Sequence, residues 1–245
     1  MHWILLRGLT REHAHWGHLP EHLRLAFPEE RFHCVDLPGT GTRFRETSPW
    51  TIRQIRRAVQ RQVAHIPGPY GLIALSMGGM VAMDWAQDAP EGEIQRLILI
   101  NTSSGFNPPW HRMRPVVWPT LLHLLLLRDI REREAQVLAL TSNRQVNPGT
   151  VQGWYSIQKQ RPVSPANAFR QLSAAARFRP ASSRPLPDAL LLASKGDRIV
   201  DWRCSATLEK RWQWPLRLHP DAGHDLPLDD PEWVVQQLQT YLSDT

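Results

Sequence analysis

Cysteine is scarce in this sequence of 245 residues, and long hydrophobic stretches are missing. Its two cysteines, Cys34 and Cys204, are too few for a disulfide framework, so we expect a reducing compartment, most simply the cytoplasm. The longest apolar run, Leu121 to Leu127, is interrupted by His123 and is far too short to span a bilayer. Arg7 interrupts the first apolar segment. We therefore expect neither a secretory signal nor a membrane span.

Lysine is almost absent, although the protein is basic. Lysine plus arginine is 29 and aspartate plus glutamate is 23, which gives a formal net charge of +6. The only lysines are Lys159, Lys195 and Lys210, and the arginines are scattered without a long run of like charges. Without a basic patch or an aromatic-basic motif, nucleic acid is not an expected partner. A basic balance still suits an anionic substrate or an acidic carrier protein.

Motifs that bind metals or nucleotides are also missing. Histidines at positions 13, 15, 18 and 22 lie close together, but they lack the His-Glu-x-x-His spacing of a zinc site. Gly39-Thr40-Gly41 is an isolated fragment of a dinucleotide fingerprint, and there is no phosphate-binding P-loop. The sequence therefore predicts no metal ion and no cofactor.

Short apolar runs alternate with helical segments in the first hundred or so residues. The runs are nearly continuous, as expected for strands that are buried on both faces of a parallel sheet. They are His2–Leu6, Phe32–Val35, Gly71–Leu75 and Leu97–Ile100. Helices are predicted over Trp50–His65 and Met77–Gln87. This alternation predicts an α/β fold with a mostly parallel, doubly wound sheet.

The alternation stops after Gly105. From residue 106 to 183 the helical periods are irregular, no strand is apparent, and prolines divide the segment into short helices. Strands are expected again at Ala189–Ala193 and Leu216–Leu218, with helices at Ser205–Trp212 and from Glu232 to Leu242. We therefore expect residues 1–105 and 184–245 to form one α/β unit, with a helical insertion of residues 106–183 after its fourth recognisable strand.

Ser76 lies at a junction that suits a nucleophile. It follows the predicted strand Gly71–Leu75 directly, and small residues, Ala74 and Gly78, lie two positions before and after it. This spacing is typical of a nucleophile elbow, a sharp turn that projects the serine hydroxyl from the carboxyl edge of the sheet. The helix that begins there directs free N–H groups to the same place, so the Met77 N–H is a candidate oxyanion donor. The alternative is an incidental serine at a junction of small residues.

A serine nucleophile needs a base, and the base needs an orienting partner. Asp197 follows the predicted strand Ala189–Ala193, and His224 follows the next strand, just ahead of the last helix. The order Ser, Asp, His, with each member in a loop at the same sheet edge, is the order expected for this arrangement. We predict Ser76, Asp197 and His224 as the catalytic residues. Asp201 is a weaker candidate for the acid.

Together these segments resemble the α/β-hydrolase family over essentially the whole chain, with the helical insertion as the cap. In that family the loop after the first strand usually reads His-Gly, and the next backbone N–H completes the oxyanion hole. The resemblance gives this role to Leu9, with Arg7 in place of the usual histidine. Asp36 is similar to a family residue that orders a loop. Where some relatives carry their acid, this chain reads Asn101-Thr102-Ser103 and has no carboxylate.

The chain looks most like the small carboxylesterases of this family. That resemblance implies a serine hydrolase that cleaves a carboxylic ester or thioester of a small to medium acyl group through an acyl-enzyme. The partners would be a small-molecule substrate and, as a further candidate, an acidic carrier protein. Two alternatives stay open. A C–C hydrolase or lyase acting on an anionic substrate predicts buried arginines near Ser76, whereas an inactive fold member would act as a binding protein, for which Arg7 is the only indication.

Residues of the insertion should determine the substrate. Trp110, Trp118 and Leu122 offer apolar surface that could line an acyl pocket, although apolar residues of this kind more often pack a cap onto its core. Arg128, Arg131 and Arg133 follow. They could face an acidic carrier or a carboxylate, whereas such charges more often form a solvated face.

Overall fold

A single parallel sheet organises the molecule. The computed structural model describes residues 1–145 and 147–243, and in these the sheet has the strand order β2-β1-β3-β4-β5-β6. Its strands are β1 (His2–Leu6), β2 (Arg31–Val35), β3 (Tyr70–Leu75), β4 (Ile94–Ile100), β5 (Leu190–Ser194) and β6 (Leu216–His219), and every neighbouring pair is parallel. Each predicted apolar run coincides with one strand, although β4 begins at Ile94 instead of Leu97. The predicted α/β class is confirmed.

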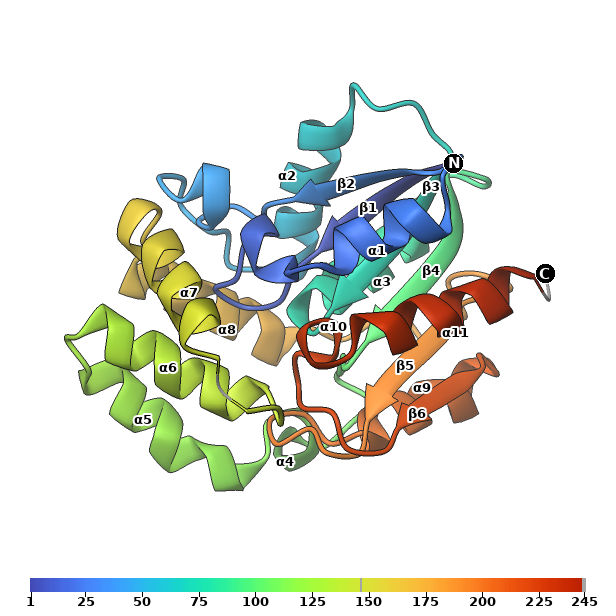
Figure 1. Cartoon of the computed structure of the whole chain (residues 1–245). Helices are drawn as coiled ribbons and strands as arrows, with labels where there is room; N and C mark the ends of the chain where they lie inside the picture. Colours follow the sequence, from blue (N-terminus) through green and yellow to red (C-terminus); the bar gives the residue numbers. More distant parts are fainter. Residues whose placement is uncertain (146, 244–245) are drawn as a thin grey trace.

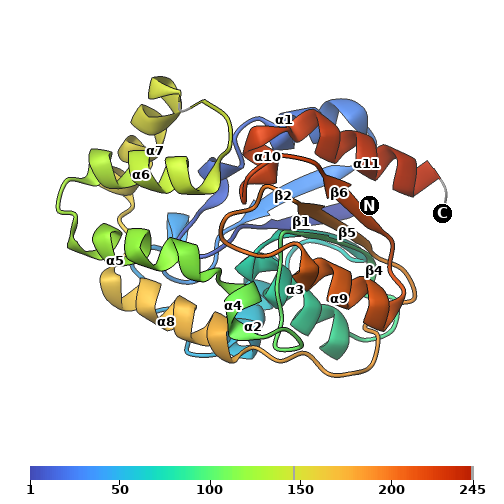
Figure 2. The ribbon, with the colours of Figure 1, turned by 90° about the horizontal axis from the view of Figure 1, so that it is seen from below.

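Helices cover both faces of the sheet (Figure 2). On one face lie α1 (Leu19–Ala26), α10 (Leu226–Asp229) and α11 (Pro231–Ser243), and on the other lie α2 (Ile52–Val63), α3 (Met77–Asp88) and α9 (Arg203–Trp212). Short 3₁₀ turns are η1 (His13–Trp16) and η2 (Gly41–Arg43). The sequence did not predict α1, which packs on α11 through Leu19 and Leu23. Its eight residues are too few for a helical pattern to stand out in the sequence.

The core continues on both sides of the sheet, which explains the continuous apolar runs. Successive residues of β1 point to opposite faces, as in any strand. Trp3 and Leu5 belong to the cluster beneath α1 and α11, whereas Ile4 and Leu6 belong to the cluster beneath α2 and α3. All four are at most 1% exposed. A strand with both faces buried shows no alternation of polar and apolar residues.

The segment between β4 and β5 is helical and lies beyond the carboxyl ends of the strands (Figure 1). It comprises α4 (Pro109–Arg112), the 3₁₀ turn η3 (Pro115–Val117), α5 (Trp118–Leu126), α6 (Ile130–Thr141), α7 (Pro148–Gln160) and α8 (Pro165–Arg177). All of them except α6 have a proline in the first turn. Proline is tolerated there because the backbone N–H that it lacks would have no partner within the helix. No helix among the described residues is long and apolar enough to cross a membrane.

Buried ion pairs join these helices to the loop after β1. Arg11 lies 2.6 Å from the carboxylate of Glu134 on α6, and Arg161, just after α7, lies 2.5 Å from that of Glu12. The two carboxylates are only 4% and 3% exposed. The loop after β1 is therefore a contact between the sheet and the helical segment. A small cluster around Leu138, Val151 and Trp154 holds α6 and α7 together.

The core position Leu191 gives a test of this arrangement. Leu191 is 0% exposed in β5, between Leu99 of β4 and Leu216 of β6, so Leu191→Ala should lower the free energy of unfolding by about 2–5 kcal/mol. The matched control is Leu25→Ala, because Leu25 is 77% exposed; its change should stay within about 0.5 kcal/mol. Equilibrium urea unfolding measures both. Equal losses in the two variants would contradict the packing described.

Candidate active site

The sheet places two loops next to each other where the winding direction reverses. The chain runs from β1 outward to β2 and then returns to the other side of β1 to form β3. Ligands of open α/β sheets bind at such a switch point, outside the carboxyl ends of the strands. The loop that contains Leu9 follows β1 there, and Ser76 follows β3.

Ser76 has a strained backbone that its neighbours hold in place. Its φ of 55° and ψ of −119° lie where non-glycine residues are rarely found. The Ser76 N–H donates to the carbonyl of Ile100 at 2.9 Å, and the Ser76 carbonyl accepts from Thr102 Oγ1 at 2.7 Å. The end of β4 therefore fixes this turn on both sides. The residue is partly exposed, as a nucleophile must be.

Two glycines allow the turn to approach β1. A Cβ at Gly78 would collide with the carbonyl oxygens of Leu6 and Arg7, and a Cβ at Gly8 would lie 3.1 Å from Ser76 Cβ. The start of α3 can pack directly on the end of β1 only without these side chains. This explains the small residue two positions after Ser76.

Two backbone donors are free beside the serine. Within residues 1–145 and 147–243, neither the Leu9 N–H nor the Met77 N–H has a hydrogen-bond partner. Met77 is the first residue of α3, so the positive end of the helix dipole adds to its N–H. The loop beyond Leu9 is held by Gln171 of α8, whose side-chain oxygen accepts from the Thr10 N–H at 2.9 Å. Such free donors can stabilise a developing oxyanion.

His224 and Asp197 form a buried pair. The His224 Nδ1 lies 2.7 Å from Asp197 Oδ2, and Asp197 is 1% exposed. The other Asp197 oxygen accepts from the backbone N–H groups of Ile199 and Val200 at 2.7 and 3.0 Å. The carboxylate is thus fixed in place and can hold the imidazole with Nε2 unprotonated and available as a base. Asp201 instead pairs with Arg203.

The His224 loop is attached to the same end of β4 as Ser76. Asn101, which follows Ile100, donates from its side chain to the carbonyls of His224 and Gly223 at 2.9 and 3.3 Å. Its side-chain oxygen accepts from the Ser194 N–H at 2.8 Å. From the sequence alone, this position is recognisable only as one that lacks a carboxylate. Its amide has the required donor and acceptor, but no local motif indicates their partners.

The contact between serine and histidine is not formed. Nothing in the described part of the chain makes a hydrogen bond with the Ser76 hydroxyl. The structure thus joins His224 to Asp197 and attaches the loops of Ser76 and His224 to the adjacent residues Ile100 and Asn101 at the end of β4. Catalytic hydrogen bonds are often long before substrate binds and tighten only in the complex.

Burial and the neighbouring carboxylates shift the pKa of His224 in opposite directions. Burial lowers the pKa of the imidazole, but the Asp197 carboxylate raises it through its charge and its hydrogen bond, and the charge of Asp225 adds to this effect. The charge of Arg7 lowers the pKa. The result is a His224 pKa above the ordinary value of 6.5.

The predicted substrate residues of the insertion lie at the surface. Trp110, Trp118 and Leu122 are 58%, 51% and 64% exposed. One hollow of about 370 Å³ lies between α6 and the loop after Asp197, and another of about 390 Å³ lies between α4 and α9. Neither is lined by Ser76 or by these three residues.

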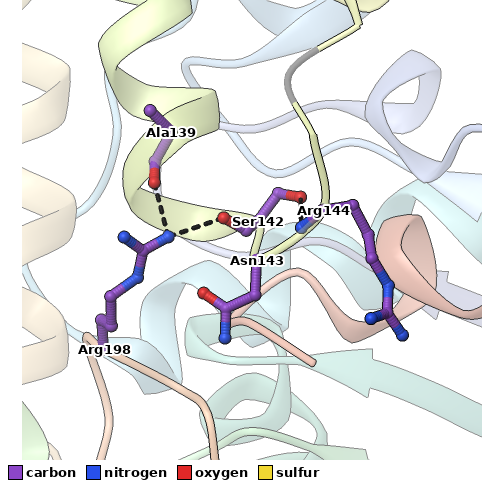
Figure 3. Close-up of a pocket in the computed structure, with 5 residues that line it drawn as sticks. All are labelled: Ala139, Ser142, Asn143, Arg144 and Arg198. Atoms are coloured by element: carbon purple, nitrogen blue, oxygen red, sulfur yellow. Dashed lines mark hydrogen bonds between the residues drawn. The ribbon is translucent and has the colours of Figure 1, made fainter. Parts of the chain in front are cut away.

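The hollow beside Asp197 is where the insertion meets the core (Figure 3). Arg198 donates from one nitrogen to the carbonyls of Ala139 and Ser142 at 2.5 and 2.6 Å. Arg144 lines the same hollow and lies 3.2 Å from the Asp221 carboxylate. Both arginines therefore have protein partners, and the loop that carries Asp197 is bonded to the end of α6.

The histidines near the N-terminus have other contacts. His13 bonds to the Asp36 carboxylate at 2.8 Å, and His15 is buried beside Arg11. The Asp36 carboxylate also accepts from the Thr42 N–H at 2.8 Å, so it holds the loop after β2. In the part of the chain that the structure describes, no three or more His, Cys, Asp or Glu side chains are grouped to hold a metal ion.

Comparison with known proteins agrees with this architecture. Residues 3–237 match the Alpha/beta hydrolase family, and the chain belongs to that family. It is 27% identical over 249 aligned residues to the pimeloyl-[acyl-carrier protein] methyl ester esterase of Nitrosomonas europaea, an alignment that covers 95% of this chain and 92% of that protein.

Solved structures show the same fold. A hydrolase from Pseudomonas aeruginosa superposes with a TM-score of 0.76 at 17% identity, over 98% of this chain and 89% of that one. An esterase from Exiguobacterium antarcticum gives a TM-score of 0.74 at 16% identity, over 99% of this chain and 92% of that one. The predicted family and fold are confirmed, and membership of this family supports a hydrolase.

The contact between His224 and Asp197 can be tested by histidine NMR. The His224 imidazole should titrate above 6.5, and Asp197→Asn should move its titration to lower pH, because the carboxylate charge that opposes burial is lost. The variant His224→Gln assigns the resonance, and Asp201→Asn is the matched control that should leave the titration unchanged. An unchanged titration in Asp197→Asn would show that the two groups do not interact.

Proposed function

We propose that the protein is a serine hydrolase that cleaves a carboxylic ester or thioester through an acyl-enzyme. The observation that carries this proposal is the buried 2.7 Å bond between His224 and Asp197, whose histidine loop is held at the same end of β4 as the strained turn of Ser76. A histidine with one nitrogen held by a carboxylate is the base that a serine hydroxyl requires.

The chemistry would proceed in two acyl-transfer steps. His224 Nε2 removes the proton from Ser76 as the hydroxyl attacks the carbonyl carbon, and Asp197 stabilises the imidazolium that forms. The N–H groups of Leu9 and Met77 hold the oxyanion. The imidazolium then protonates the leaving alcohol or thiol, and His224 activates a water that releases the acyl group from Ser76.

The proposed substrate carries a small to medium acyl group. We assign residues 106–183 to a cap and the exposed apolar side chains of Trp110, Trp118 and Leu122 to contact with the acyl chain. The similarity to a methyl ester esterase whose name gives a carrier-linked substrate supports an acidic carrier protein as partner. The basic net charge of +6 favours such a partner electrostatically.

The environment of Arg7 argues against the two alternative functions, a C–C hydrolase or lyase for an anionic substrate and an inactive binding protein. A lyase for an anionic substrate needs a buried arginine that is free to bind it, whereas Arg7 is paired with Asp225 at 2.6 Å. An inactive binding protein would have lost its oxyanion donors. The Leu9 and Met77 N–H groups have no partner in the described residues, and Arg7 leaves them free.

A fluorophosphonate probe tests the nucleophile. It should label the native protein, and Ser76→Ala should abolish the labelling and lower kcat on p-nitrophenyl esters by about three orders of magnitude or more. Adding His224→Ala to Ser76→Ala should lower kcat little further, because the residues act as a unit. The control is Ser205→Ala, which changes a buried serine of α9 and should still be labelled. Labelling that persists in Ser76→Ala would refute the assignment.

A carrier-linked ester tests the partner. Arg128 and Arg131 are exposed, so Arg128→Glu with Arg131→Glu should lower kcat/KM about tenfold or more for an acyl methyl ester on an acidic carrier protein. The value for the same ester without the carrier should stay within about twofold, because surface charges are screened from small neutral molecules. Equal losses for the two substrates would exclude carrier recognition by this surface. Varying the acyl length in both series measures the preferred chain.

A further inference from the structure

A second buried ion pair lies beside the proposed site. The two terminal nitrogens of Arg7 bond to the two oxygens of Asp225 at 2.9 and 2.6 Å, and the side chains are 3% and 4% exposed. The guanidinium also lies 4.9 Å from the ring centroid of Trp16. Two parallel bonds to one carboxylate fix the orientation of both groups, as a single contact would not.

The Arg7–Asp225 pair connects the loop of the proposed oxyanion donor Leu9 to the loop of the proposed base His224. Arg7 precedes Gly8 and Leu9, and Asp225 directly follows His224. The backbone N–H of Asp225 donates to the Thr141 carbonyl at the end of α6 at 2.8 Å. The bond between the Arg7 and Asp225 side chains therefore joins the loop of Leu9 to the loop of His224.

We propose that Arg7 and Asp225 form a positioning pair that sets the His224 imidazole against the oxyanion donor Leu9. This inference rests on the proposed function, because it assigns these two residues their roles through His224 and Leu9. Neither side chain touches the reacting atoms. Arg7 directs both terminal nitrogens to Asp225, and its Nε is buried without a hydrogen-bond partner among the described residues.

The charges of the pair also oppose each other at His224. Asp225 raises the pKa of the imidazole and Arg7 lowers it, while Asp197 on the other side raises it. The Asp229 carboxylate faces the same loop and accepts from the Gly223 N–H at 2.7 Å. Removing one member of the pair therefore leaves a single uncompensated charge near the base, with an effect whose sign depends on the member removed.

The test combines single and double variants. In Arg7→Gln the His224 titration, followed by NMR, should move to higher pH, and in Asp225→Asn it should move to lower pH. The acid limb of the kcat/KM profile, which rises as His224 loses its proton, should shift in the same directions. Single variants leave a buried charge unpaired and can destabilise the fold strongly, so Arg7→Met with Asp225→Leu removes both charges together.

This double variant should fold and lose about ten- to a hundredfold in kcat with little change in KM, because misplaced groups weaken mainly the transition state. The matched control is Arg56→Met with Asp84→Leu, which removes a buried arginine and its partner, 2.8 Å apart between α2 and α3; Arg56 also pairs with Asp88, whose carboxylate is exposed to water. Its kcat should stay within about twofold of the native value.

Two results would overturn the proposal: a folded Arg7→Met, Asp225→Leu variant with native kcat, or titration shifts of the same sign in the two single variants. Either result can be told apart from failure of the proposed function. If the proposed function is wrong, the native protein shows no labelling of Ser76. The NMR titration of His224 reports on the Arg7–Asp225 pair even without catalytic activity.

Discussion

The end of β4 connects two parts of the proposed site that are far apart along the chain, the turn of Ser76 and the loop of His224. There the Ile100 carbonyl accepts from the Ser76 N–H, and the adjacent Asn101 side chain donates to the His224 carbonyl. Neither bond takes part in the proposed chemistry. Because one bond starts from the last residue of β4 and the other from the residue that follows it, the turn of the serine and the loop of the histidine are held by the same end of one strand. The positive φ of 43° at Asn101 turns its amide into this position.

Much of this arrangement could be predicted from the sequence, for physical reasons. A strand buried on both faces must be apolar throughout, so β1 and β3 are visible as continuous runs. A sharp turn between strand and helix requires small neighbours, which singles out Ser76, and a parallel sheet brings the loops after its strands to one edge. The catalytic roles of Ser76, Asp197 and His224 are predicted on this basis. They stay predictions, although His224 and Asp197 are in contact.

The features of the site that the sequence could not indicate are contacts between residues that are far apart along the chain. Arg7 and Asp225 are separated by 218 positions, and no local pattern relates them. Arg7 alone suggested a damaged oxyanion loop, whereas its side chain points to Asp225 and leaves the backbone donors free. Asn101 was missed for the same reason, since an amide reveals its role only through the groups that it joins. The helix α1 was missed because it is only eight residues long, too short for its pattern to stand out.

The carboxylates of Glu12 and Glu134, which join the loop after β1 to the helices between β4 and β5, are almost fully buried. Pulling these helices away from the sheet would separate buried charges before water could reach them, which is costly. Salt screens such contacts only weakly. Wide swinging of the whole segment about a hinge is therefore disfavoured at any ionic strength. Local rearrangement of side chains or of α5, which carries no such anchor among the ion pairs of the described residues, would leave these buried pairs intact.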